Sequence, residues 1–138
     1  MSALYTAVAT SSGDGRNGHV RTDDGLIDAD TRVPQAMGGP GGATNPEQLF
    51  AAGYAACFGS ALGVVGRAAK VDVSDAAVTA EVGIGKQGEG FGLAVTLRVE
   101  LPDSVDEETG RKLVEQAHQV CPYSNATRGN IDVDLVIE

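Results

Sequence analysis

The chain is poor in aromatic residues and in positive charge. Among its 138 residues there is no tryptophan, and aromatic residues make up only 4%. We therefore expect a core of Val, Ala, Leu and Ile, for which a hydrophobic share of 42% is sufficient in one globular domain. Ten lysines and arginines stand against 19 acidic residues, so the formal net charge is −9. Such an acidic chain has no general affinity for phosphate backbones, and we expect no nucleic-acid binding.

Signals for export, membranes, metals and cofactors are also missing. Residues 1–10 contain no basic region followed by an apolar core, and we expect no run of about 18 apolar residues that would span a membrane. We therefore predict a cytoplasmic protein. His19 and His118 belong to no Cys-x-x-Cys or His-x-x-x-His pair, so we interpret both as surface or capping residues and predict no metal site. We also predict no bound cofactor.

Hydrophobic periodicity predicts a mixture of strands and helices. Alternating segments of strand type surround two segments with the periodicity of helices, and glycine-rich turns separate several of them. The order is β-β-β-α-β-β-α-β, which indicates a single α+β domain over residues 1–138 with antiparallel sheets. The predicted elements are strands at 4–10, 19–22 and 26–33, a helix from 46 to about 70, strands at 76–85 and 93–101, a helix at about 106–119 and a strand at 131–137.

The first helix is long and unusually apolar. Asn45 is the expected N-cap, Pro46 takes the first helical position, and Glu47 lies in the first turn, where the helix dipole favours a carboxylate. From Leu49 to Ala69 only two strongly polar residues interrupt small and apolar ones, so we expect protein to cover most sides of this helix. One small sheet covers a single side. We therefore predict a homodimer that shares these helices.

The two thiols, Cys57 and Cys121, lie in different surroundings. Cys57 lies within the apolar helix, whereas Cys121 opens a Cys-Pro-Tyr-Ser segment in which Pro122 prevents the second helix from continuing. Each has an ordinary interpretation as a small buried core residue. In a reducing cytosol two thiols do not stay paired by default, so any disulfide between them would belong to a reaction cycle.

Arg16 and Glu47 are candidates for activating a thiol. Arg16 lies in a glycine-rich turn and is either simply solvated or a guanidinium that lowers a thiol pKa. Glu47 either only favours the helix N-terminus or also holds that arginine in a bidentate pair. Glu47 and Cys57 are separated by ten residues, roughly 15 Å along one helix, so they cannot meet within it. Two helices crossing antiparallel near residue 52 would bring them level, and we therefore expect the carboxylate that holds Arg16 to come from the second subunit.

Two long strings carry a family resemblance. VPQAMGGPGGATNPEQLFAAGYAACF at 33–58 and VCPYSNATRGN at 120–130 resemble the organic hydroperoxide resistance proteins of the OsmC-like family. The resemblance spans nearly the whole chain and implies the OsmC-like fold, in an intertwined homodimer with two active sites at the interface. It also implies the roles of individual residues: Cys57 as peroxidatic cysteine, Cys121 as resolving cysteine, Arg16 as catalytic arginine, with Arg21 as the other candidate, and Glu47 as its partner.

The activity implied by the resemblance is a thiol peroxidase in the response to oxidative stress. The Cys57 thiolate would attack an organic hydroperoxide and become a sulfenic acid, with which Cys121 would form a disulfide. Because apolar surroundings raise a thiol pKa, we expect Arg16 to be essential. The implied reductant is a dihydrolipoyl group on a lipoylated protein. We further predict that apolar Met37, Phe50 and Phe58 line a pocket for alkyl and fatty-acid hydroperoxides.

Two alternative functions stay open at this point. One is an OsmC-type peroxidase of the neighbouring subfamily, which would share the fold and chemistry but differ in substrate. The other is a non-catalytic dimer that senses redox state or binds a ligand in the same cleft. Turnover of a peroxide separates both enzymes from such a binding protein.

Overall fold

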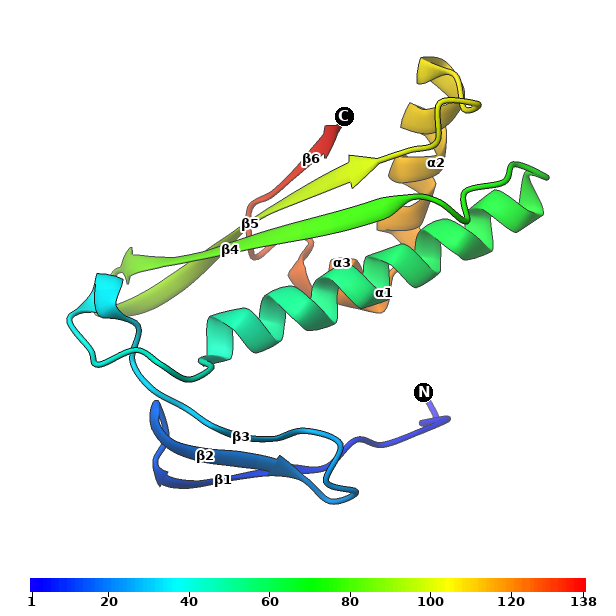
Figure 1. The fold of residues 1–138 in the computed structure, drawn as a ribbon. Helices are drawn as coiled ribbons and strands as arrows, with labels where there is room; N and C mark the ends of the chain where they lie inside the picture. The colour runs from blue at the N-terminus through cyan, green and yellow to red at the C-terminus, as the bar shows by residue number, and fades with distance from the viewer. The chain divides into compact units, whose positions relative to one another are not determined.

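Three short strands form an antiparallel meander near the N-terminus (Figure 1). The computed structural model describes residues 1–138, which fall into two units, Met1–Leu49 and Phe50–Glu138. In the first unit β1 (Ala9–Asp14), β2 (Asn17–Thr22) and β3 (Asp28–Asp30) pair in that order. All of β1 is exposed, as are Leu4, Tyr5 and Val8 ahead of it. This unit therefore has little apolar core of its own.

The first hairpin turn is tighter than predicted. β1 starts later than the predicted strand at 4–10, and the ladder continues until Asp14 pairs with Asn17, so only Gly15 and Arg16 form the turn. Gly15 has φ +55°, a left-handed conformation that glycine adopts without strain and that tight hairpin turns require. The polar, glycine-rich sequence has no apolar alternation here, which is why its strand ends could not be located. As a result Arg16 lies at the tip of a hairpin.

The start of the long helix is as predicted. After the short 3-10 helix η1 (Gln35–Met37) and a glycine-rich loop, α1 (Pro46–Ala68) begins with proline at its first position. The Oδ1 atom of Asn45 accepts a hydrogen bond of 2.9 Å from the backbone N–H of Gln48, which confirms the predicted N-cap. This cap fixes where the helix begins, with Glu47 in its first turn.

The second unit contains a three-stranded sheet with β5 at its centre. β4 (Ala77–Gln87) and β5 (Gly90–Glu100) form a long antiparallel hairpin, and β6 (Val133–Ile137) pairs with the other edge of β5 in parallel. The prediction of purely antiparallel sheets is therefore wrong for β6. Between β5 and β6 the chain forms α2 (Glu107–Val120) and the short α3 (Pro122–Thr127), the kind of crossover that a parallel pair requires. α3 was not predicted, because six residues carry too little periodicity to identify a helix.

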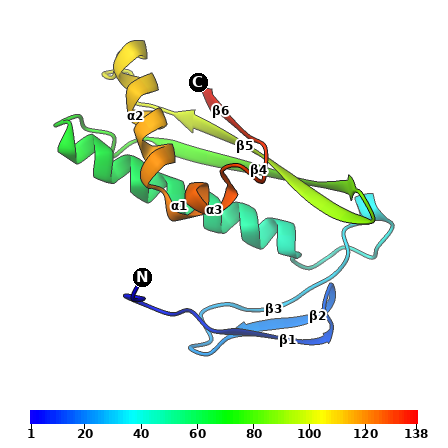
Figure 2. The ribbon, with the colours of Figure 1, turned by 180° about the vertical axis from the view of Figure 1, so that it is seen from behind.

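The core of this unit lies between the sheet and the helices. Figures 1 and 2 show α1 running alongside the sheet, with α2 and α3 next to it. The central strand contributes Val95, Leu97 and Val99, all at most 3% exposed, and α2 contributes Leu113 and Val114. The predicted core composition is thus confirmed, since aliphatic residues dominate it.

Only one side of α1 is buried within a single chain. The exposed side carries Ala52, Ala56, Ser60 and Val64, so the expectation that protein covers most sides is not met by one chain. With a mean hydropathy of 1.6 the helix is also long and apolar enough to cross a membrane by length and composition alone, contrary to the sequence-based expectation. A core helix passes the same test, and the buried side of α1 packs in the core. The buried residues of α1 are Tyr54, Phe58, Ala61, Leu62, Val65 and Gly66.

Candidate active site

Cys57 and Cys121 lie side by side in the second unit. Their Sγ atoms are 3.4 Å apart, and both are free thiols. Cys57 comes from α1 and is partly exposed, whereas Cys121 is completely buried. A disulfide needs an S–S distance of about 2.05 Å, so the two sulfurs have little more than 1 Å to close. The prediction that two distant cysteines meet in space is confirmed.

The junction between α2 and α3 places the Cys121 thiol. Its backbone N–H donates to the carbonyl of Ala117 at 2.9 Å, which closes α2, and its carbonyl accepts from the N–H of Asn125 at 2.9 Å, which opens α3. Pro122 at the first position of α3 enforces the change of direction. Cys121 therefore ends α2 and begins α3, and its thiol lies at the bend between the two helices.

The surroundings of Cys57 do not favour its thiolate. Burial is the largest effect and raises the pKa of the Cys57 thiol, and the adjacent Cys121 raises it further. A backbone hydrogen bond from Tyr123 acts in the opposite direction but does not outweigh burial. Since only the thiolate is a strong nucleophile, a positive charge supplied from elsewhere would increase the reactivity of Cys57.

Arg16 and Glu47 form a bidentate ion pair in the first unit. The Nη1 atom of Arg16 donates to Glu47 Oε2 at 2.9 Å, and Nη2 donates to Oε1 at 2.7 Å. Each group favours the charged form of the other, since the pair lowers the pKa of Glu47 and raises that of Arg16. A guanidinium has five N–H donors, of which this pair uses two. Glu47 therefore fixes the position of the Arg16 guanidinium and leaves its other donors available, although the ion pair as a whole carries no net charge.

The pairing lies within one chain, so the expectation that the carboxylate comes from the second subunit is wrong. That expectation came from the spacing along α1 alone, which cannot show where the tip of the hairpin lies relative to the start of the helix. Arg21, the other candidate arginine, lies with its Nε atom 3.7 Å from Asp28 Oδ2 instead. Of the two arginines, the structure thus pairs Arg16 with Glu47.

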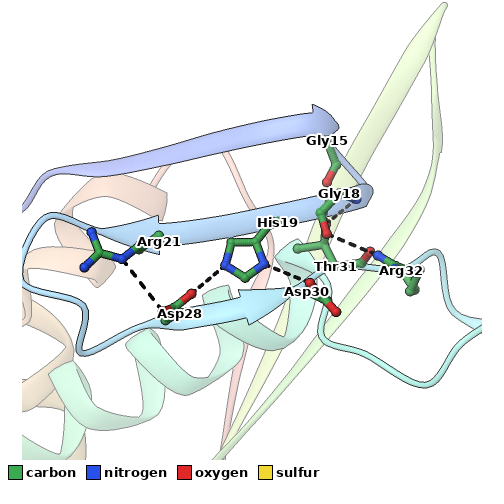
Figure 3. Close-up of polar contacts among 8 residues, drawn as sticks. All are labelled: Gly15, Gly18, His19, Arg21, Asp28, Asp30, Thr31 and Arg32. Atoms are coloured by element: carbon green, nitrogen blue, oxygen red, sulfur yellow. Dashed lines mark hydrogen bonds and ion pairs between the residues drawn. The ribbon is translucent and has the colours of Figure 1, made fainter.

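A buried threonine clamps the turn that carries Arg16 (Figure 3). The Thr31 hydroxyl donates to the carbonyl of Gly15 at 2.5 Å and accepts from the N–H of Gly18 at 2.9 Å. Arg32 Nη1 adds a 3.1 Å bond to the Gly18 carbonyl. Thr31 is only 4% exposed, so its hydroxyl is well shielded from water. Sequence reasoning missed this role of Thr31, because its hydrogen bonds reach residues 16 and 13 positions earlier in the chain.

Replacing Thr31 with valine is expected to loosen this turn. Valine keeps the shape but removes the hydroxyl, so the Gly18 amide loses its acceptor at a cost of about 1–2 kcal/mol. We expect hydrogen exchange of the Gly18 amide to accelerate by roughly 5- to 30-fold, measured by NMR. Thr10→Val in the exposed strand β1 is the matched control and should leave that amide unchanged. Equal exchange in both variants would rule out the clamp.

The two histidines contact polar partners. His19 lies on β2 between two carboxylates of β3, with Nε2 2.5 Å from Asp28 and Nδ1 2.8 Å from Asp30 (Figure 3). Hydrogen bonds to Asp30 and Asp28 raise its pKa. Its side chain is 39% exposed, which agrees with its interpretation as a surface residue. His118, in contrast, is part-buried, with Nδ1 2.8 Å from Ser124 Oγ, so it is more than a surface or capping residue. No group of three or more His, Cys, Asp or Glu side chains is placed to hold a metal ion.

The three residues predicted to line a pocket lie in different places. Met37 is 42% exposed in η1 of the first unit, and Phe58 is completely buried in the core of the second. Phe50 packs edge-on against Tyr54 and Tyr123, each with ring centroids 6.1 Å away. A common substrate pocket for Met37, Phe50 and Phe58 stays a prediction.

A buried hydrogen-bond network beside the thiols was missed by sequence reasoning. The Tyr54 hydroxyl lies 2.8 Å from Ser124 Oγ and 3.1 Å from Thr127 Oγ1. Burial is the main cause that lowers the pKa of His118, and the charge of Arg128 adds to it, so the imidazole is neutral at neutral pH and can accept from Ser124. Tyr54 and Ser124 are 70 residues apart in sequence. The available signal was their equal spacing of three residues from Cys57 and Cys121.

Comparisons with known proteins agree over nearly the whole chain. A family model described as OsmC-like protein matches residues 39–136. An organic hydroperoxide resistance protein from Xanthomonas axonopodis pv. citri is 50% identical over 136 residues, which cover 97% of this chain and 94% of that protein.

Solved structures agree as well. A crystal structure of an organic hydroperoxide resistance protein from Legionella pneumophila is 50% identical, covers 99% of both chains and has a TM-score of 0.94. Another, from Elizabethkingia anophelis with thiocyanate bound, is 51% identical, covers 100% of this chain and 99% of that one, and also has a TM-score of 0.94. On this evidence the chain belongs to the OsmC-like family and, within it, to the organic hydroperoxide resistance proteins.

Proposed function

We propose that this protein is a thiol peroxidase that reduces organic hydroperoxides to alcohols in the response to oxidative stress. The observation that carries the proposal is the 3.4 Å separation of two free thiols, Cys57 and Cys121. The relatives support the substrate class, because they are named for resistance to organic hydroperoxides. Two free thiols also suit a reducing compartment, so we place the protein in the cytoplasm.

The first step is attack by the Cys57 thiolate on the distal oxygen of the hydroperoxide. The S–O bond forms as the O–O bond breaks, and the leaving alkoxide takes up a proton and departs as an alcohol. Cys57 is thereby oxidised by two electrons to a sulfenic acid. Since burial raises the pKa of Cys57, this step needs the thiolate to be stabilised.

The second step forms a disulfide between Cys57 and Cys121. The Cys121 sulfur attacks the sulfenic sulfur, the S–O bond breaks, and the hydroxyl leaves as water with the Cys121 proton. Cys121 is placed for this because its sulfur already lies within about 1.5 Å of bonding distance. A dithiol then reduces the disulfide, and we propose dihydrolipoyl groups of lipoylated proteins as its source.

The Arg16 guanidinium, held in place by Glu47, supplies the stabilising positive charge in this proposal. Glu47 holds the guanidinium through two of its donors, and the remaining donors are suited to a thiolate and a peroxide oxygen. We propose a homodimer in which each subunit presents its own ion pair to Cys57 of the partner subunit. The exposed side of α1 and the exposed apolar residues ahead of β1 support such an assembly, since both leave apolar surface uncovered in one chain.

Steady-state kinetics test this function. We expect tert-butyl hydroperoxide to be reduced with a kcat/KM well above that for hydrogen peroxide, and dihydrolipoamide to sustain turnover better than thioredoxin. A preference for hydrogen peroxide would favour a peroxidase of the neighbouring OsmC-type subfamily. Saturable binding without turnover by either reductant would favour a non-catalytic redox sensor or ligand-binding dimer.

A further inference from the structure

Three segments of the second unit meet at the hydroxyl of one buried serine. Ser124 Oγ lies 2.8 Å from the Tyr54 hydroxyl of α1 and 2.8 Å from Nδ1 of His118 in the last turn of α2, while Ser124 itself belongs to α3. Tyr54 and Ser124 are both 0% exposed. These bonds therefore connect the two helices that flank Cys121 with the helix that carries Cys57.

The hydrogen bonds run one turn away from the two thiols. Tyr54 precedes Cys57 by three residues on α1, and Ser124 follows Cys121 by three residues at the start of α3. The contact between Tyr54 and Ser124 therefore joins the same two segments as the contact between the sulfurs. Loss of the contact between Tyr54 and Ser124 is therefore expected to change the distance between the sulfurs of Cys57 and Cys121.

α3 depends on this network for its position. It has only six residues, far fewer than an isolated helix needs to be stable in water. Its last residue, Thr127, is also within 3.1 Å of the Tyr54 hydroxyl. Tyr54 thus contacts α3 at two points that are three residues apart, and this holds the middle and the C-terminal end of the segment against α1.

The hydrogen bonds of this network can all be satisfied at once. In the tautomer of neutral His118 whose Nδ1 is an acceptor, the Ser124 hydroxyl donates to Nδ1 and the Tyr54 hydroxyl donates to Ser124 Oγ; in the other tautomer both directions are reversed. The Thr127 hydroxyl lies 3.1 Å from the Tyr54 oxygen and can also donate to the Ser124 carbonyl at 3.2 Å, so it has a partner in both directions. Removal of either the tyrosine or the serine hydroxyl interrupts this chain and leaves buried polar atoms without a partner.

We propose that Tyr54 and Ser124 are positioning residues that hold the resolving thiol of Cys121 within reach of the Cys57 sulfenic acid. The inference deepens the proposed function and rests on it. Tyr54 and Ser124 take no part in bond making. They raise the fraction of time in which Cys121 is close enough to displace the sulfenic hydroxyl as water, and so they shorten the lifetime of that oxidised state.

This role predicts a separation between the two chemical steps. Attack on the peroxide needs only Cys57 and its cationic partner, so it does not depend on where α3 lies. Formation of the disulfide needs both thiols at close range. When the hydrogen bond between Tyr54 and Ser124 is lost, the sulfenic acid should persist long enough to be captured by a trapping reagent or oxidised further by excess peroxide.

The test measures two rates in Tyr54→Phe and Ser124→Ala: the attack of Cys57 on the peroxide and the formation of the disulfide with Cys121. Each full-length variant is mixed rapidly with one equivalent of tert-butyl hydroperoxide, in parallel samples with and without dimedone, which captures sulfenic acids. Mass spectrometry then follows the sulfenic adduct and the disulfide over time. Ser104→Ala, which removes a hydroxyl from an exposed residue in the turn before α2, is the matched control.

We expect both variants to consume peroxide within twofold of the wild-type rate and to form the disulfide roughly tenfold more slowly, about the effect of one net hydrogen bond. The dimedone adduct should accumulate on Cys57 in both variants and not in Ser104→Ala. Disulfide formation at the wild-type rate in both variants, or equal slowing of both steps, would overturn the positioning role alone. If the wild-type protein forms neither adduct nor disulfide, the proposed function itself is wrong and the inference falls with it.

Discussion

Replacing Cys57 with serine is expected to abolish hydroperoxide reduction, with a loss of at least about 10³-fold in kcat/KM, because the only proposed nucleophile is removed. Replacing Cys121 with serine should have a different result. In the Cys121→Ser variant Cys57 can still attack one peroxide, so each chain should release about one alcohol molecule. The reaction should then stop, since no second thiol is present to form the disulfide. The amount of alcohol per chain, measured by chromatography, distinguishes these outcomes.

The two variants act as controls for each other, since each loses a single sulfur. Cys57 lies on α1 and Cys121 at the helix junction, where it is completely buried, so folding of both variants has to be verified by circular dichroism. Continued turnover by Cys57→Ser would contradict the assignment and make Cys121 the attacking thiol. A stable sulfenic acid on Cys57 in Cys121→Ser would support it directly.

Loss of Arg16 is expected to be the second largest effect. Arg16→Ala removes the positive charge proposed to stabilise the thiolate, so the rate of attack at pH 7 should fall by roughly 10- to 100-fold. The sign of the pH effect follows from the environment of the thiol. Burial already raises the pKa of Cys57, and without the guanidinium it should rise further, so less thiolate is present at any given pH below it.

Alkylation of Cys57 by iodoacetamide, followed against pH in the Cys121→Ser background, measures this shift. The pH at which alkylation reaches half its maximal rate should be higher in Arg16→Ala than in the parent protein. A smaller increase is expected in Glu47→Gln, in which an amide nitrogen replaces one of the two carboxylate oxygens that bind Arg16. Arg21→Ala is the matched control, because Arg21 is paired with Asp28 and not with Glu47. A shift in Arg21→Ala and none in Arg16→Ala would assign the role to Arg21 instead.

Features that depend on neighbouring residues could be predicted from sequence. Asn45, Pro46 and Glu47 specify a helix start through side-chain hydrogen bonding, a fixed φ and the helix dipole, and the structure places the helix start at this point. Pro122 likewise marks the junction at which Cys121 lies, because it cannot continue α2. Both cysteines could therefore be placed on their elements before any tertiary structure was considered.

Features that depend on pairing between residues far apart in the chain could not be predicted from sequence. The direction of β6 is set by the crossover through α2 and α3, and Glu47 meets Arg16 across 31 residues. The Tyr54 hydroxyl contacts Ser124 across 70 residues, and their equal spacing of three residues from the two cysteines does not by itself identify them as partners. Periodicity shows which face of an element is apolar, but it does not show which polar groups that face will meet.

In the proposed function, Cys57 and Cys121 form a redox pair that an organic hydroperoxide oxidises. The most direct measurement is mass spectrometry of the reduced protein after reaction with one equivalent of tert-butyl hydroperoxide without air. We predict that the chain loses two hydrogens, that a proteolytic fragment links Cys57 to Cys121, and that one alcohol forms per chain. If both thiols can still be alkylated and the peroxide is recovered intact, the two cysteines are not a peroxidatic pair.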